Sequence, residues 1–286
     1  MTPFLFLHYY LIKLTTEKFQ MHKKKFKDPS GTTITRHIPF EGASNFRDYG
    51  GYKTMSGHVI KWRQLFRSDQ LSRLTEKDQD QFSRLDIRIV FDFRREDERK
   101  KDPSLFPLSA TPETVPLPID PGSAFGFSEN MTSGNMDSLT MAGFMCDINK
   151  EFVIDQADKY RQMFTSLLKH DAGGSLVHCA AGKDRTGFAV AMVLSALGVP
   201  RDTIFADYML TAQYFLIDKE IARASKKYRW SGEPEVMRPM LEVRPDYLQS
   251  AFDIIDEQFP TVEDYLQEVL GVGQAERGWL QARYLE

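Results

Sequence analysis

The segment Val177–Gly187, VHCAAGKDRTG, decides how the rest of the chain is read. It begins at the end of a short apolar stretch, GGSLVH, and continues into a predicted helix over Thr186–Leu197, which Gly198 and Pro200 bring to an end. The order of these signals predicts a strand, a tight loop and a helix. Because backbone N–H groups in such a loop point inward and the helix adds its positive N-terminal end, the loop is suited to hold an anion.

The side chains in this loop suggest a nucleophile and a phosphate ligand. A thiol at Cys179 is stabilised as the reactive thiolate by the surrounding N–H groups. Arg185 carries a planar, permanently charged guanidinium that matches two phosphoryl oxygens, and Thr186 can hydrogen-bond the thiolate when it leaves phosphorus. We expect phosphate to contact Ala180, Ala181, Gly182, Lys183, Arg185 and Thr186. These parts predict displacement at phosphorus through a phosphocysteine intermediate.

Two other kinds of site are excluded by the same residues. In a Walker-type ATP loop the Gly182-Lys183 pair would be followed by Ser or Thr, but Asp184 stands there. The adjacent His178 and Cys179 lack a second ligand pair at the spacing of a zinc site. We therefore expect no metal and no cofactor, and we expect His178 to hydrogen-bond the backbone near the nucleophile.

Composition places the chain among ordinary globular proteins. It has 286 residues, of which 42% are hydrophobic and 27% charged, which is enough for a full core. The net charge of −3 gives no sign of nucleic-acid binding. With only two cysteines, Cys146 and Cys179, there is no disulfide framework, and Cys146 is expected to be an ordinary apolar residue. We expect a reducing, cytoplasmic location. The alternative is that the protein is secreted even though it has no recognisable signal peptide.

The N-terminal residues 1–30 differ from the rest. The apolar stretch MTPFLFLHYYLIK is too short to cross a bilayer and lacks the basic start of a signal peptide, and a basic run follows it. We expect a disordered or loosely docked tail, or an over-long start with Met21 as the true initiator. A membrane-surface anchor is the third reading. No transmembrane segment is expected.

Residues 31–286 read as one α/β domain with strands early and helices late. A Gly/Ser/Met-rich, nearly uncharged stretch around 122–146 is expected to be either a mobile flap with short helices or a flexible insertion, and to form or support a flap over the pocket. The predicted elements are a hairpin over 44–60, a helix capped by Thr75 with Asp78, a buried strand over Ile87–Arg94, an extended region over 104–121, and helices over 152–168, 202–217, 246–258 and 261–270.

Four motifs together carry a resemblance to a known family. HCAAGKDRTG, with NFRDYGGY, LFRSDQLSRLT and IRIVFDFRREDE upstream, resembles the atypical bacterial tyrosine phosphatases. The likeness covers most of residues 40–217. It implies the cysteine-phosphatase fold, a central, mostly parallel sheet flanked by helices, with a helical C-terminal part. It also implies a phosphorylated protein as the partner, with phosphotyrosine as the first substrate and phosphoserine, phosphothreonine and phosphoinositides as others.

The resemblance also implies a general acid. Family members use an aspartate at the position of Asp184, inside the loop, and a nearby dianion helps such a carboxyl to keep its proton. The alternative is that Asp184 only caps the helix or orients Arg185. Asp92 at the end of the predicted strand is the other candidate acid, unless it pairs with Arg94 or Arg185. Which aspartate is the acid stays open.

Lys183 bears on the choice between protein and lipid. Lipid phosphatases of the phosphatase-and-tensin type carry lysine at this position and a second lysine where this chain has Ala180. Lys183 can therefore either grip a second ring phosphate or stand as a solvated charge on the rim. Arg47, Asp48 and Arg67 are expected to be scaffold or rim groups. The rival functions are a phosphoinositide phosphatase and a phosphate-binding pseudophosphatase module.

Overall fold

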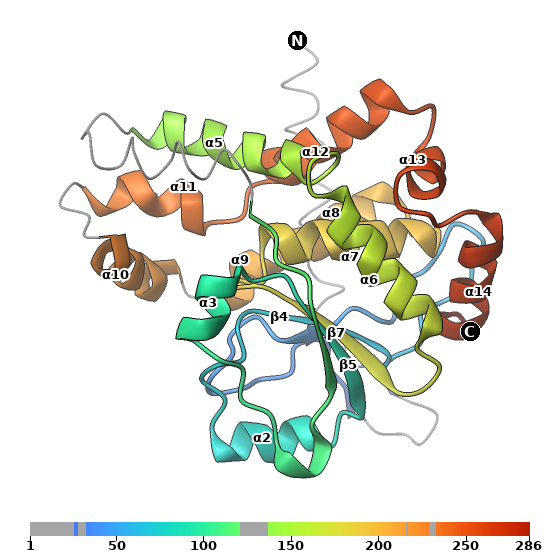
Figure 1. Cartoon of the computed structure of the whole chain (residues 1–286), viewed down its shortest axis with the longest axis horizontal. Helices are drawn as coiled ribbons and strands as arrows, with labels where there is room; N and C mark the ends of the chain where they lie inside the picture. Colours follow the sequence, from blue (N-terminus) through green and yellow to red (C-terminus); the bar gives the residue numbers. More distant parts are fainter. Residues whose placement is uncertain (1–25, 28–32, 121–136, 216, 229–232) are drawn as a thin grey trace.

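The protein, described here from a computed structural model, is built around one five-stranded sheet (Figure 1). The structure describes residues 26–27, 33–120, 137–215, 217–228 and 233–286. The strand order is β3-β4-β7-β5-β6, with β3 antiparallel to β4 and all other pairs parallel. The strands of this sheet are β3 (Arg47–Asp48), β4 (Leu65–Ser68), β5 (Ile87–Asp92), β6 (Glu113–Pro116) and β7 (Gly174–His178).

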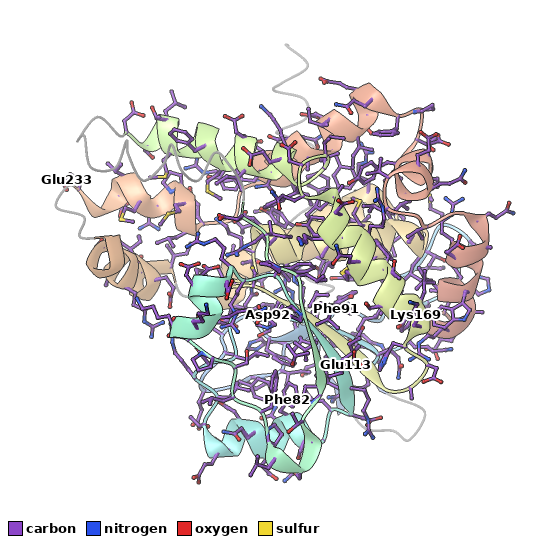
Figure 2. The ribbon with its side chains drawn as sticks, viewed as in Figure 1. Phe82, Phe91, Asp92, Glu113, Lys169 and Glu233 are labelled. Carbon is purple, nitrogen blue, oxygen red and sulfur yellow. The ribbon has the colours of Figure 1, made fainter. Side chains whose placement is uncertain are left out.

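Helices cover the sheet on both faces, and each face has its own hydrophobic cluster. α2 (Glu76–Ser83) lies below the sheet in the view of Figures 1 and 2. Its Phe82 belongs to the same hydrophobic cluster as Leu176 of β7. Phe91 of β5 and Val177 of β7 belong to the larger cluster on the other face. The other helices are α3 (Glu96–Lys101), α5 (Ser138–Glu151), α6 (Ala157–Lys169), α7 (Asp184–Ala196), α8 (Arg201–Met209), α9 (Thr211–Tyr214), α10 (Ile217–Tyr228), α11 (Arg238–Leu241), α12 (Pro245–Gln258), α13 (Val262–Glu268) and α14 (Gln274–Tyr284).

The parallel arrangement places the loop of the signature segment at the carboxyl end of the sheet. β7 is the central strand, its five residues are all buried, and it leads directly into the loop before α7. A crevice beyond the carboxyl ends of parallel strands is where α/β proteins bind ligands. The expected α/β fold, with a central and mostly parallel sheet and a helical C-terminal part, is confirmed.

Several predicted elements are confirmed together with their caps. The hydroxyl of Thr75 accepts a hydrogen bond from the backbone N–H of Asp78, which forms a capping box at the start of α2. The hydroxyl of Thr261 accepts a hydrogen bond from the backbone N–H of Asp264 and so caps α13. The predicted hairpin closes through a bridge between Lys53 and Val59.

Other elements begin or end elsewhere. The helix expected over 152–168 begins at Ala157, because α5 occupies the preceding residues up to Glu151 and a turn separates the two. The helix expected over 202–217 is divided into α8 and α9 at Leu210. The proline-rich region contains the edge strand β6, where Pro116 is tolerated because an edge strand leaves N–H groups unpaired.

The expected tail and insertion are described only in part. Residues 1–25, 28–32 and 121–136 lie outside the described residues. Phe26–Lys27 (β1) pairs with Thr33–Ile34 (β2) in a small antiparallel sheet. Residues 138–146 of the expected insertion form the first part of α5 rather than a loop.

α5, α11 and α12 lie together and build one wall above the loop. Figure 1 shows α5 and α11 side by side at one end of the molecule, with α10 and α3 beneath them. Met141 and Met237 form the centre of a separate apolar cluster there. No helix in the described part of the chain is long and apolar enough to cross a membrane.

Candidate active site

The loop between β7 and α7 makes a turn that requires glycine at one position. Gly182 has a φ of +63°, in the left-handed region that L-residues with a side chain rarely adopt. A Cβ atom at Gly182 would lie 2.3 Å from the carbonyl oxygen of Ser68. The close approach of the loop to the end of β4 therefore depends on this glycine.

Scaffold residues hold the loop from outside. The side-chain amide of Asn45 donates to the carbonyl oxygens of Ala181 at 3.1 Å and Gly182 at 3.0 Å. The guanidinium of Arg67 donates to the Gly182 carbonyl at 2.9 Å. These hydrogen bonds keep the carbonyl groups of the loop pointing toward the scaffold. The N–H groups of the loop are then favoured to point the other way, toward a bound ligand.

A buried ionic cluster lies behind the loop. Asp207 accepts a hydrogen bond from Arg67 at 2.6 Å and one from the Tyr52 hydroxyl at 3.0 Å, and Arg47 lies 3.6 Å away. Burial alone would raise the pKa of Asp207, but the two arginines outweigh it and lower the pKa well below its usual range. Arg47, Asp48 and Arg67 are fully buried, so they are scaffold groups and do not form the rim.

The loop forms the floor of a pocket of about 440 Å³. Loop residues that line it are Cys179, Ala180, Ala181, Lys183, Asp184 and Arg185. Cationic side chains in the lining are Arg73, Arg95, Lys101 and Arg223, and carboxylates there are Asp69, Glu98, Asp102 and Glu220. Apolar residues in the lining include Met145, Ile148, Phe152, Met240 and Leu241. A ligand that has an anionic group at the floor of the pocket and an apolar group next to it fits this lining.

The nucleophile candidate is positioned at the floor of the pocket. Cys179 directly follows β7 and is 2% exposed. Thr186, in the first turn of α7, is fully buried, and its hydroxyl has no hydrogen-bond partner among the described residues. Buried hydroxyls are seldom left without a partner, so this donor is available for a ligand or for the Cys179 sulfur.

Arg185 is held by a residue that the sequence analysis missed. Its Nη1 donates to Oε2 of Glu98 at 2.8 Å and to the carbonyl oxygen of Phe93 at 3.1 Å. Burial alone would raise the pKa of Glu98, but the charge of Arg185 outweighs it and lowers the pKa to about 2. Glu98 therefore stays ionised and fixes one edge of the guanidinium at the pocket.

Asp184 is the first residue of α7 and lines the pocket, with its side chain 16% exposed. The hydroxyl of Tyr208 from α8 donates to its Oδ1 at 3.2 Å. The ammonium of Lys183 lies 3.4 Å from its Oδ2. The carboxyl is thus held from two sides and still reaches the pocket.

Lys183 is not the solvated rim charge considered from the sequence. Its side chain is 1% exposed, and its ammonium donates to the carbonyl oxygens of Met240 at 2.6 Å and Glu242 at 2.7 Å. Burial lowers the pKa of Lys183 from its ordinary value. Its ammonium therefore bonds to the α11–α12 connection.

Asp92 has a different environment from Asp184. Its carboxylate accepts three hydrogen bonds from Arg94: from the backbone N–H at 3.0 Å, from Nε at 3.0 Å and from Nη2 at 2.7 Å. Asp92 is not among the residues that line the pocket. Burial alone would raise the pKa of Asp92, but the charge and hydrogen bonds of Arg94 outweigh it and lower the pKa. Of the pairings considered for Asp92, the structure shows the one with Arg94 (Figure 2 labels Asp92 at the end of β5).

His178 lies behind the nucleophile. Its Nδ1 lies 3.4 Å from the carbonyl oxygen of Cys179, and its Nε2 lies 3.5 Å from Asp92. Burial lowers the pKa of His178 to about 4, so the imidazole is neutral near pH 7. The expected contact between His178 and backbone near the nucleophile is present.

Three site residues were missed from the sequence: Glu98, Tyr208 and Asn45. Glu98 lies in the charged run RREDERK, where nothing distinguishes it from its neighbours. Tyr208 is 24 residues from Asp184, and Asn45 is more than 130 residues from the loop carbonyls that it contacts. Only the folded chain brings them to the site.

Comparison with known proteins gives one family. A family model described as the tyrosine phosphatase family matches residues 38–286. A putative tyrosine-protein phosphatase of Cupriavidus necator is 32% identical over 259 residues, which cover 87% of this chain and 89% of that protein. The triple specificity protein phosphatase PtpB of Mycobacterium tuberculosis is 32% identical over 271 residues, which cover 84% of this chain and 95% of that protein.

Among solved structures, TpbA of P. aeruginosa matches with a TM-score of 0.29 and 16% identity, over 64% of this chain and 89% of that one. The family model and the two relatives extend over nearly the whole described domain, including the loop that holds Cys179 and Arg185. The chain therefore belongs to the tyrosine phosphatase family, whose members are hydrolases.

Proposed function

We propose that this chain removes phosphate from phosphotyrosine in proteins through a phosphocysteine intermediate, with Cys179 as nucleophile, Arg185 as phosphate ligand and Asp184 as general acid and then base. The observation that carries this proposal is that these three residues line the floor of one pocket. The apolar residues of the pocket lining offer a surface for the tyrosine ring, and the cationic residues suit the phosphate.

In the first step the Cys179 thiolate attacks phosphorus and the bond from phosphorus to the tyrosine oxygen breaks. Asp184 gives its proton to that oxygen, so tyrosine leaves as the neutral phenol. The free edge of Arg185 and the N–H groups of the loop stabilise the phosphoryl oxygens. Glu98 keeps the guanidinium in place because it holds the other edge.

In the second step a water molecule attacks phosphorus and gives a proton to the Asp184 carboxylate. The P–S bond breaks, phosphate leaves and the Cys179 thiolate is restored. The unpartnered hydroxyl of Thr186 is suited to donate to that thiolate. Asp184 ends this step protonated, ready for another cycle.

The surroundings of the two aspartates favour Asp184 as the acid. Asp92 is held by Arg94 and its pKa is lowered, so it carries no proton to give near neutral pH. Asp184 lines the pocket, where a leaving oxygen would lie, whereas Asp92 does not. Asp92 is therefore proposed as a structural residue.

Substrate range and location extend this proposal. The relative named a triple specificity protein phosphatase supports a range wider than one substrate, and we propose phosphoserine and phosphothreonine as further substrates. The two cysteines, Cys146 and Cys179, are both free, which suits a reducing compartment, and we place the activity in the cytoplasm.

The leaving-group dependence of two variants tests the proposal. Tyrosine leaves with a conjugate-acid pKa of about 10, so a donated proton contributes about 10² to 10⁴ in rate. Asp184→Asn should slow a phosphotyrosine peptide by about that factor and slow an aryl phosphate with a stable anionic leaving group much less. Asp92→Asn should show no such difference. The opposite pattern would assign the acid to Asp92 and refute the proposed role of Asp184.

A further inference from the structure

The first turn of α7 is packed against a tyrosine of the next helix. Tyr208 belongs to α8, which lies beside α7 (Figure 1), and it is 1% exposed. Asp184 and Gly187 are three positions apart in α7, so they lie on the same face of the helix. The Tyr208 hydroxyl donates to Oδ1 of Asp184 at 3.2 Å. A Cβ atom at Gly187 would lie 2.6 Å from Cε2 of Tyr208, so the ring occupies the space that a side chain there would need.

These two contacts fix the position of the Tyr208 hydroxyl. A tyrosine side chain has only two torsions, and a ring enclosed by its neighbours cannot change them freely. Burial raises the pKa of Tyr208 well above its ordinary value, so the hydroxyl keeps its proton and remains a donor. One oxygen of Asp184 can accept this hydrogen bond whether the carboxyl is protonated or ionised. With Oδ1 occupied as an acceptor, the proton of the acid form belongs on Oδ2.

Oδ2 of Asp184 is held less closely than Oδ1. It lies 3.4 Å from the ammonium of Lys183, which makes shorter hydrogen bonds, at 2.6 and 2.7 Å, to the carbonyl oxygens of Met240 and Glu242. Without the Tyr208 hydroxyl, either oxygen of the carboxyl could carry the proton, and the side chain could turn to another rotamer. A reacting group that is displaced by about 1 Å can lower a rate by about 10²-fold.

We propose that Tyr208 is a positioning residue for the general acid: its ring, packed in the space left by Gly187, holds its hydroxyl on Oδ1 of Asp184, so that Oδ2 carries the proton for the leaving oxygen. This inference rests on the proposed function of Asp184. Tyr208 is not among the residues that line the pocket. It therefore acts on the reaction through Asp184 and not through a contact with the substrate.

The test compares Tyr208→Phe with the unaltered protein on a phosphotyrosine peptide and on para-nitrophenyl phosphate. For both substrates kcat/KM includes the step in which the leaving group departs, but the peptide depends far more on a donated proton. Phenylalanine keeps the ring and removes only the hydroxyl. We expect kcat/KM to fall about tenfold or more for the peptide and less than about threefold for para-nitrophenyl phosphate. The ratio of the two values does not depend on the fraction of enzyme that is folded.

Tyr265→Phe is the matched control. The hydroxyl of this buried tyrosine donates to the carbonyl oxygen of Val153 at 2.8 Å, so the variant loses a buried hydrogen bond that does not involve the acid. The ratio of the two kcat/KM values should stay as it is in the unaltered protein. In the Asp184→Asn background, adding Tyr208→Phe should change either value by less than about twofold, because the group on which Tyr208 acts is gone.

The outcomes separate this inference from the proposed function. Equal losses on the two substrates in Tyr208→Phe, or losses that multiply when it is combined with Asp184→Asn, would show that Tyr208 only supports the fold and would overturn the proposal. If Asp184→Asn shows the leaving-group dependence and Tyr208→Phe does not, only this inference fails. If Asp184→Asn shows no leaving-group dependence, the proposed function of Asp184 fails first, and this inference fails with it.

Discussion

Replacing Glu98 with glutamine removes the charge that orients the phosphate ligand Arg185. The two side chains are mostly buried, with 12% and 17% of their surfaces exposed, and the shorter N–O distance is 2.8 Å. A hydrogen bond to a charged group contributes about 1.5–3 kcal/mol. About 1.4 kcal/mol corresponds to a tenfold change. If this energy holds Arg185 in place for the transition state, Glu98→Gln should lower kcat/KM by about tenfold to hundredfold.

Steady-state kinetics on a phosphotyrosine peptide measure this effect, with thermal unfolding as a check on the fold. Glutamine keeps an oxygen that can accept the backbone N–H of Arg95 at the start of α3, so stability should change little. Glu96→Gln on the same helix is the control, because Glu96 pairs with Lys100 on the exposed surface and such pairs contribute little. An unchanged or higher kcat/KM in Glu98→Gln would show that Glu98 competes with phosphate and would refute the positioning role.

Three further predictions concern the support of the loop. Gly182→Ala should lower the free energy of unfolding by at least about 1 kcal/mol, measured by urea denaturation, because the positive φ disfavours alanine and its Cβ meets Ser68. Arg67→Met should cost about 3–5 kcal/mol in the same assay, since it breaks a buried pair with Asp207; a cost below 1 kcal/mol would contradict the scaffold role. Because the pKa of His178 is about 4 and an unfolded imidazole titrates near 6.5, the stability due to His178 should be full above about pH 6.5 and be lost toward pH 4. NMR should then show no titration of this imidazole between about pH 5.5 and 8.

The sequence predicts the parts of the site that are local. The strand, loop and helix around Cys179 follow from an apolar run, glycines and a helix stop that are adjacent in the chain. Cap residues such as Thr75 are likewise recognisable, because a cap contacts backbone three residues away. These signals do not depend on how distant segments meet.

The parts that depend on distant contacts could not be predicted. Lys183 reads as a surface charge in a polar loop, and only the packing of α11 and α12 over it buries the side chain. The sequence around 122–146 predicts at most short helices, because this nearly uncharged stretch has a weak periodicity. Ser138–Glu151 instead forms the 14-residue helix α5, which is stabilised by contacts with α11 and α12. Glu98 reaches Arg185 from a helix 87 residues earlier in the chain.

The central claim is that Cys179 carries the phosphoryl group between the two steps. Rapid quenching of the enzyme during turnover of a phosphotyrosine peptide, followed by peptide mass spectrometry, tests it directly. We expect phosphate covalently bound to Cys179 in the quenched enzyme. We also expect no hydrolysis by Cys179→Ser, because a serine hydroxyl is a much weaker nucleophile than a cysteine sulfur. Steady turnover with no phosphate on Cys179, together with an active Cys179→Ser variant, would contradict the mechanism.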